Sequence, residues 1–150
     1  MNKDTKSFEL KECFINKVYY EENNSYIVGL AVEEEVYAIE LNSYDATLLT
    51  FVQWDCAQYS HIHIIHQILL KFQESAGFIL EKIIIEAKHG DVFYCRLQWS
   101  KNNNKVYSVI SIGDALILHS LSKKPMWITQ FVVGQLEKYE EDGFMNNIEE

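Results

Sequence analysis

The sequence predicts an α+β fold of about seven strands in antiparallel meanders, arranged as several mixed sheets, with three helices. Apolar residues alternate with a period of two in several segments, and they take a helical period in three others. In addition, 150 residues with 48% hydrophobic character are enough to bury the core of one ordinary domain. We therefore expect a single domain over residues 1–135 and an acidic, frayed tail over residues 136–150.

The amino-terminal part predicts the first meander. Between Phe8 and Tyr20 most apolar residues fall on even positions, which is typical of a strand with one partly apolar face. Polar turns at residues 21–24 and 33–35 then separate two further strands, Ser25 to Val32 and Val36 to Leu41.

Two helices are predicted next. From Ser43 to Cys56 the apolar residues follow a helical stripe, and Ser43 is placed to cap the helix. Ser60 is the candidate cap of a second helix, whose apolar stripe ends before Gly77. Glycine is a favoured residue just after a helix, so the second helix has a clear end.

The second meander begins with an isoleucine-rich segment, Phe78 to Lys88, which contains three isoleucines in a row. Such a segment predicts a central strand that is covered on both faces. Turns at residues 89–91 and 101–104 return the chain as two more strands, Val92 to Ser100 and Lys105 to Ile110.

A third helix is predicted from Ala115 to Lys123. It is apolar almost all round, so we expect it to be deeply buried. Lys123 and Lys124 lie at its carboxyl end, where the helix dipole favours cations. Pro125 prevents the helix from continuing, and the short strand Met126 to Thr129 follows, with one more helical turn after it.

One arrangement of elements occurs twice. A hairpin followed by an acid-bearing helix is predicted over Ser25 to Phe51 and again over Val92 to Leu121, so that Asp45 and Asp114 lie near equivalent helix starts. An aspartate in the first turn complements the helix dipole and can cap free N–H groups. A structural role of this kind is the leading expectation for both residues.

Charge and composition exclude some classes of function. The net charge is −9, and an acidic body argues against tight, sequence-independent nucleic-acid binding, because that affinity comes from cations that neutralise phosphates. Aromatic residues such as Trp54 and Tyr107 have no Lys or Arg interleaved with them, so we expect them in the core or an interface. No apolar run reaches membrane-spanning length and no secretory leader is recognisable, so we expect no membrane partner and a cytoplasmic location.

The cysteine and histidine patterns favour ordinary structural roles. The three cysteines, Cys13, Cys56 and Cys95, are far apart in apolar segments and form no CxxC pair, so we expect buried, reduced thiols. His63 and His66 could share a helical face, but a zinc site needs further ligands that the neighbouring sequence lacks. A polar helix face is therefore the expected role of these histidines and of His61.

Two segments carry a further signal, KIIIEAKHGDVFYCRL and SIGDALILHSLSKKPMWIT. Together with positions upstream they fit, in order, motifs of one family: Asp45-Ala46, His66, Phe93-Tyr94, Leu97, Asp114-Ala115 and Pro125. On these residues the chain resembles the bifunctional nuclease domain family, from about Phe8 to Val133. The resemblance implies an α+β fold and nuclease action on DNA or RNA.

The resemblance also implies a site. Asp45, His66 and Asp114 become catalytic candidates, with Asp45 and Asp114 as candidate ligands of Mg or Mn, the ions that carboxylates hold in phosphodiesterases. Lys123 and Lys124 are candidate contacts to the phosphates of a nucleic-acid substrate.

One departure from the family favours a different function. The residues Ser111-Ile112-Gly113 stand where the family has Arg-Pro-Ser, and a planar arginine fork that holds phosphate is not replaced by Ser or Ile. The alternative is a non-catalytic module that keeps the fold and forms a homo-oligomer or binds a protein partner.

Overall fold

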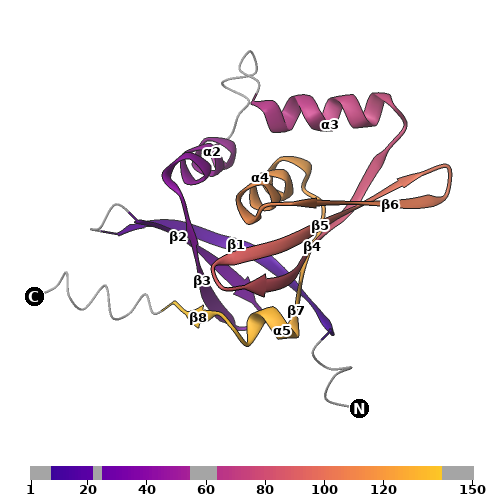
Figure 1. Ribbon diagram of the computed structural model, residues 1–150. Helices are drawn as coiled ribbons and strands as arrows, with labels where there is room; N and C mark the ends of the chain where they lie inside the picture. The colour runs from indigo at the N-terminus through magenta and orange to yellow at the C-terminus, as the bar shows by residue number, and fades with distance from the viewer. Residues whose placement is uncertain (1–7, 22–24, 55–63, 140–150) are drawn as a thin grey trace, which may run out of the picture.

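The computed structural model describes residues 8–21, 25–54 and 64–139 and shows one mixed sheet of eight strands (Figure 1). The strands are β1 (Leu10–Glu21), β2 (Ser25–Val32), β3 (Glu35–Leu41), β4 (Ile79–His89), β5 (Val92–Lys101), β6 (Asn104–Ile110), β7 (Met126–Thr129) and β8 (Glu137–Lys138). The described helices are α2 (Ser43–Gln53), α3 (Ile65–Ser75), α4 (Ile112–Ser122) and α5 (Gln130–Val133). The strand order across the sheet is β6-β5-β4-β7-β1-β2-β3-β8.

The predicted architecture of several sheets, about seven strands and three helices is wrong. β7 lies between β4 and β1 and joins the two meanders into one sheet. It pairs in parallel with β4 and antiparallel with β1, because α4 carries the chain back across the sheet after β6. β8 adds an eighth strand, and the helical turn expected after β7 is α5, the fourth helix in the described part of the chain.

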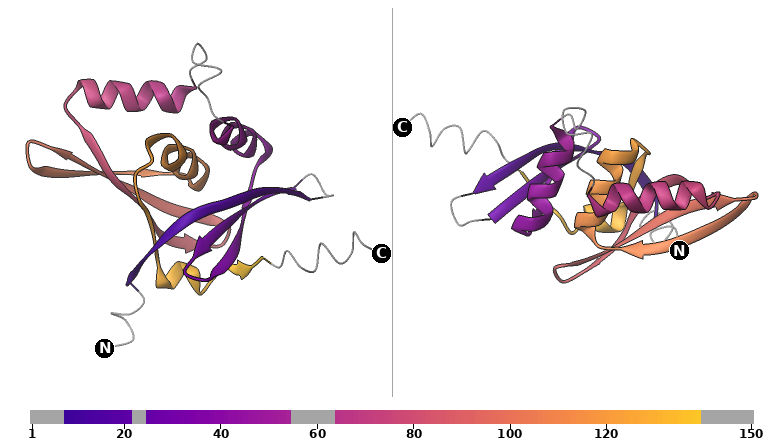
Figure 2. Two further views of the ribbon diagram at one scale, coloured as in Figure 1. Left: turned by 180° about the vertical axis from the view of Figure 1, so that it is seen from behind. Right: turned by 90° about the horizontal axis from the view of Figure 1, so that it is seen from above.

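The core lies between one face of the sheet and the helices α2 and α4, which lie side by side (Figure 2). As its sequence predicts, α4 is deeply buried, with residues 115–118 almost inaccessible to solvent. Residues 83–85 of β4 are buried on both faces of the sheet, because α5 packs against this strand from the side opposite α4. The prediction of a central isoleucine strand is confirmed.

The prediction that the even-numbered residues of β1 form its apolar face is wrong for the first half of the strand. Cys13 is fully buried, whereas Phe14 is exposed. A β-bulge between Ile15 and Lys17 shifts the alternation by one residue, so that Val18 returns to the core side. The simple period of two does not reveal such an inserted residue.

The repeated arrangement of hairpin and helix is confirmed. β3 begins at residue 35 and β6 at residue 104, a spacing of 69 residues, and the same spacing relates the ends of these strands and both ends of α2 and α4. The hairpin registers repeat as well, since Val32 pairs with Glu35 and Lys101 pairs with Asn104. β1 and β4 also start 69 residues apart.

Two further expectations concern the end of the chain and the membrane. Glu137 and Lys138, which fall within the predicted tail, pair with β3 as β8, and residues 140–150 lie outside the described residues. Across the residues that the structure describes, none of the helices combines the length and the apolar character that a membrane span requires.

Candidate functional site

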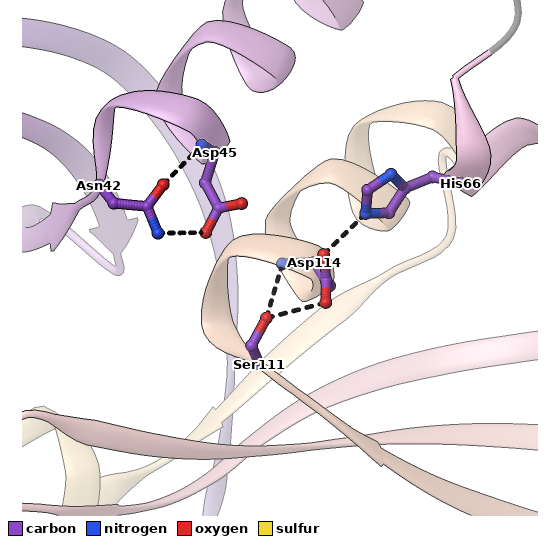
Figure 3. A network of polar contacts seen from close by, with 5 residues as sticks. All are labelled: Asn42, Asp45, His66, Ser111 and Asp114. Atoms are coloured by element: carbon purple, nitrogen blue, oxygen red, sulfur yellow. Dashed lines mark hydrogen bonds and ion pairs between the residues drawn. The ribbon is translucent and has the colours of Figure 1, made fainter.

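The starts of α2 and α4 are built in the same way (Figure 3). Asn42 caps α2: its side-chain oxygen accepts the N–H of Asp45 at 2.8 Å, and its amide donates to the carboxylate of Asp45 at 3.0 Å. Ser111 caps α4: its hydroxyl accepts the N–H of Asp114 at 3.2 Å and donates to Asp114 Oδ2 at 2.9 Å. The caps predicted at Ser43 and Asp114 are therefore wrong. Each aspartate is the third residue of its helix, and the patterns Asn-x-x-Asp and Ser-x-x-Asp could have revealed the caps.

The two helix starts touch at Gly113. A Cβ atom at position 113 would overlap the carboxylate of Asp45. Position 113 thus requires glycine, because there is no space for a side chain. The contact places Asp45 against the first turn of α4. The contacts of Asp45 are therefore with its own cap and with Gly113.

His66 and Asp114 form a close pair. His66 Nε2 lies 2.7 Å from Asp114 Oδ1, and His66 is only 7% exposed. A carboxylate only accepts hydrogen bonds, so Nε2 carries the hydrogen. The other ring nitrogen, Nδ1, is buried and has no hydrogen-bond partner among the residues that the structure describes.

The predicted catalytic and binding residues lie in two places. His66 and Asp114 are in direct contact, and Asp45 lies across Gly113 from them (Figure 3). Lys123 and Lys124 follow the opposite end of α4, about 14 Å along the helix from Asp114 at a rise of 1.5 Å per residue. A phosphate held by these lysines would not reach the histidine–aspartate pair.

The carboxylates do not fit a Mg or Mn site as they are arranged. Mg²⁺ requires near-octahedral coordination by oxygen. Both oxygens of Asp114 already hold hydrogen bonds, from His66 and Ser111, and Asp45 Oδ2 accepts one from Asn42. Within residues 8–21, 25–54 and 64–139, no three His, Cys, Asp or Glu side chains are grouped so that they could hold a metal ion.

An apolar groove of about 530 Å³ lies beside the pair; we call it the α3 groove. Its walls include the side chains Ile65, Ile68, Leu69 and Phe72 of α3, Tyr44 of α2, and Ile110 and Leu118. The α3 residues form the stripe from which this helix was predicted, but His66 is the only residue of α3 that is fully buried. The stripe faces the groove and solvent, because α3 lies above α4 and β6 at the edge of the fold (Figure 1).

A second cavity, of about 820 Å³, lies where α2 and α4 end; we call it the carboxyl-end cavity. Lys123, Lys124 and His119 line it from α4 and the turn after it, and Trp54 from the end of α2. His119 Nδ1 lies 2.7 Å from the carbonyl oxygen of Lys124, to which it donates. Burial lowers the pKa of His119 below its usual range, although the bond to Lys124 acts in the other direction, so the ring is neutral at neutral pH.

The cysteines in the described part of the chain are inert. Cys13 and Cys95 are free and buried, as predicted, and burial raises the pKa of both thiols, that of Cys95 to about 12. A thiol with so high a pKa is no nucleophile at neutral pH. Cys56, Ser60, His61 and His63 lie outside the described residues.

Comparison with known proteins does not assign a family. No protein-family model matches the chain, and a search of curated proteins finds no match. The resemblance to the bifunctional nuclease family thus rests on the motif residues alone, and function has to be inferred from the geometry of this chain.

Proposed function

We propose that this protein is a non-catalytic interaction module that forms a homodimer through the α3 groove. The observation that carries the proposal is the exposed apolar stripe of α3. Phe72 is 75% exposed, and Ile65, Ile68 and Leu69 are exposed beside it. A stripe at positions i, i+3, i+4 and i+7 is the pattern with which a helix normally packs against a partner.

The surroundings of the stripe suit a second copy of the same chain. The only charged residues of α3 are Lys71 and Glu74, and Asp114 is the one carboxylate among the described residues that line the groove, so this surface carries little of the net charge of −9. Two copies that meet here keep most of their acidic residues apart. A two-fold interface also buries the same stripe of both copies at once, which is the usual geometry of homodimers.

The adjacent strand supports the same surface. β6 is the last strand at its end of the sheet and borders the groove through Ile110. On the same face, Val106 is exposed. An unpaired edge strand with exposed valines is normally covered by a partner or protected by charges, and β6 has Lys105 as its only charged residue.

The oligomeric state tests the proposal. Sedimentation equilibrium over a range of protein concentrations should show a dimer for the wild type and a monomer for Phe72→Ser. Phe8→Ser is the matched control, because Phe8 is 70% exposed and does not line the groove. The proposal is rejected if the wild type is monomeric throughout, or if both variants dimerise as the wild type does.

The His66–Asp114 pair favours a second candidate, hydrolysis of DNA or RNA phosphodiester bonds, which the family resemblance implies. The purified protein is incubated with single- and double-stranded substrates in Mg²⁺, in Mn²⁺ and in a chelator. Cleavage that disappears in Asp114→Ala and in His66→Ala, both still folded, supports hydrolysis by this site. Equal cleavage by the variants indicates a contaminating nuclease and rejects the candidate.

A further inference from the structure

The carboxyl-end cavity combines cations with an exposed aromatic ring. Lys17 lines it from β1 and Lys123 and Lys124 line it from the end of α4, and among the lining residues that the structure describes Glu12 is the only acidic one. The whole chain has 13 Lys and Arg residues against 22 Asp and Glu. A cavity whose described lining holds three lysines and one carboxylate is therefore a local exception in an acidic protein, and it attracts anions.

The backbone holds the two lysines that follow α4 in a defined turn. Lys123 has a φ of 60°, in the left-handed region where glycine is the usual residue after a helix. His119 donates to the carbonyl of Lys124, and the hydroxyl of Ser122 accepts the N–H of Lys124. In the described part of the chain, neither Lys123 nor Lys124 has an ion-pair partner. A non-glycine residue kept in a strained conformation suggests that its side chain is used.

The aromatic ring belongs to Trp54, the C-cap residue of α2, which is 72% exposed. Its position is equivalent to that of Lys123, because residues 54 and 123 are separated by the 69 residues that relate the two repeats. The first repeat thus contributes an aromatic surface and the second a cation to the same cavity. Trp54 was expected in the core or an interface; it does not lie in the core, and it lines this cavity together with lysines from distant parts of the chain.

We infer that the carboxyl-end cavity binds a nucleoside phosphate, with the base stacked on Trp54 and the phosphate held by Lys123 and Lys124. The volume of about 820 Å³ lies in the range of small-molecule sites. Stacking on an indole suits any base, and an ammonium group binds phosphate as a point charge. The polar side chains Gln53 and Ser120 also line the cavity and offer hydrogen bonds to a sugar or base. The inference does not depend on the dimer proposed above.

Titrations with a nucleoside monophosphate, the matching nucleoside and inorganic phosphate test the inference. Binding is followed by calorimetry and by tryptophan fluorescence, since Trp99 is buried whereas Trp54 is exposed. We expect the nucleoside monophosphate to bind more tightly than either fragment. We also expect Trp54→Ala and Lys124→Ala each to weaken it at least tenfold, about 1.4 kcal/mol. A short single-stranded oligonucleotide shows whether the nucleotide is preferred free or within a strand.

Lys71→Ala is the matched control, because Lys71 is an exposed lysine on α3 outside this cavity, and it should bind like the wild type. The absence of binding at millimolar ligand overturns the inference. If Lys124→Ala lowers the melting temperature but binds the nucleotide like the wild type, the lysine only complements the carboxyl end of α4, and its proposed contact with phosphate is overturned. If phosphate binds as tightly as the nucleotide, or if Trp54→Ala binds the nucleotide like the wild type, the proposed stacking of the base on Trp54 is overturned.

Discussion

The two repeats, β1 to α2 and β4 to α4, share the lengths of their third strand and helix, the register at the turn before that strand and the way the helix is capped, yet they differ at one equivalent position of the helix start. In the first repeat Tyr44 is exposed and lines the α3 groove; in the second its equivalent is Gly113, which accommodates the carboxylate of Asp45. Asp45 contacts its own cap, whereas Asp114 also holds His66. Local sequence builds the same helix start twice, and packing from outside the repeat makes one of them a distinct site.

The same comparison applies at the carboxyl ends. Thr50 in α2 is equivalent to His119 in α4, and Trp54 is equivalent to Lys123. All four residues line one cavity. Two copies of one scaffold, side by side, therefore bring chemically different groups together. Such a combination is not available to either repeat alone.

The largest expected effect on stability comes from placing a side chain at Gly113, the position of α4 that is equivalent to Tyr44 of α2. Gly113→Val should lower the free energy of unfolding by about 3 kcal/mol, because the new side chain competes with the carboxylate of Asp45 for the same space. Tyr44→Val, at the equivalent exposed position, should change it by less than about 0.5 kcal/mol. Urea unfolding measures both. Equal effects of the two substitutions would contradict the proposed crowding at Gly113.

A smaller difference in stability is expected between variants of the two aspartates, Asp114 and Asp45. Asp114→Ala should cost about 2 kcal/mol, because it leaves the buried ring of His66 without its partner. Asp45→Ala removes only a first-turn charge and a bond to Asn42, for which we expect about 1 kcal/mol or less. The thermal unfolding of the two variants should be compared at the same pH. A greater loss for Asp45→Ala would show that the histidine pair contributes little.

The smallest effect is a difference in pH dependence between the carboxyl ends. The pKa of His119 is lowered in the folded protein, mainly by burial, so its contribution to stability is fully present above the unfolded value of 6.5 and is lost as the pH falls through the folded value. Replacing it with the equivalent residue of the first repeat, His119→Thr, should flatten the stability curve below pH 6.5. Urea midpoints between pH 4 and pH 8 measure the difference from the wild type, and parallel curves would contradict it.

Much of the fold was predictable because its signals are local. The helical stripe of α4 and the isoleucines of β4 predicted buried elements, and both are buried. Gly77 ends α3 with a φ of 90°, as its residue type indicates. The repeat was visible from the order of elements and the two aspartates. The bulge in β1 was not predictable, because one inserted residue leaves no mark on the composition of a strand.

The sites were predictable only in part. The family resemblance predicts His66 and Asp114 as site residues, and their side chains meet at 2.7 Å although 48 residues separate them along the chain. The resemblance also places Lys123 and Lys124 in this site, but the length of α4 separates them from it. The sequence does not predict that Trp54 and these lysines line one cavity, because no spacing along the chain relates an aromatic residue at the end of one helix to cations at the end of another.

By itself, the sequence determined where helices and strands form, which of them are apolar on all sides, and that one hairpin–helix unit occurs twice. Periodicity, turn residues and the single proline are properties of neighbouring residues, and they act in the same way wherever the segment lies. The tertiary structure alone decided that β7 joins both meanders, that the stripe of α3 stays exposed, and that the two repeats share their cavities. These outcomes depend on which distant surfaces exclude water together, and local pattern does not encode that choice.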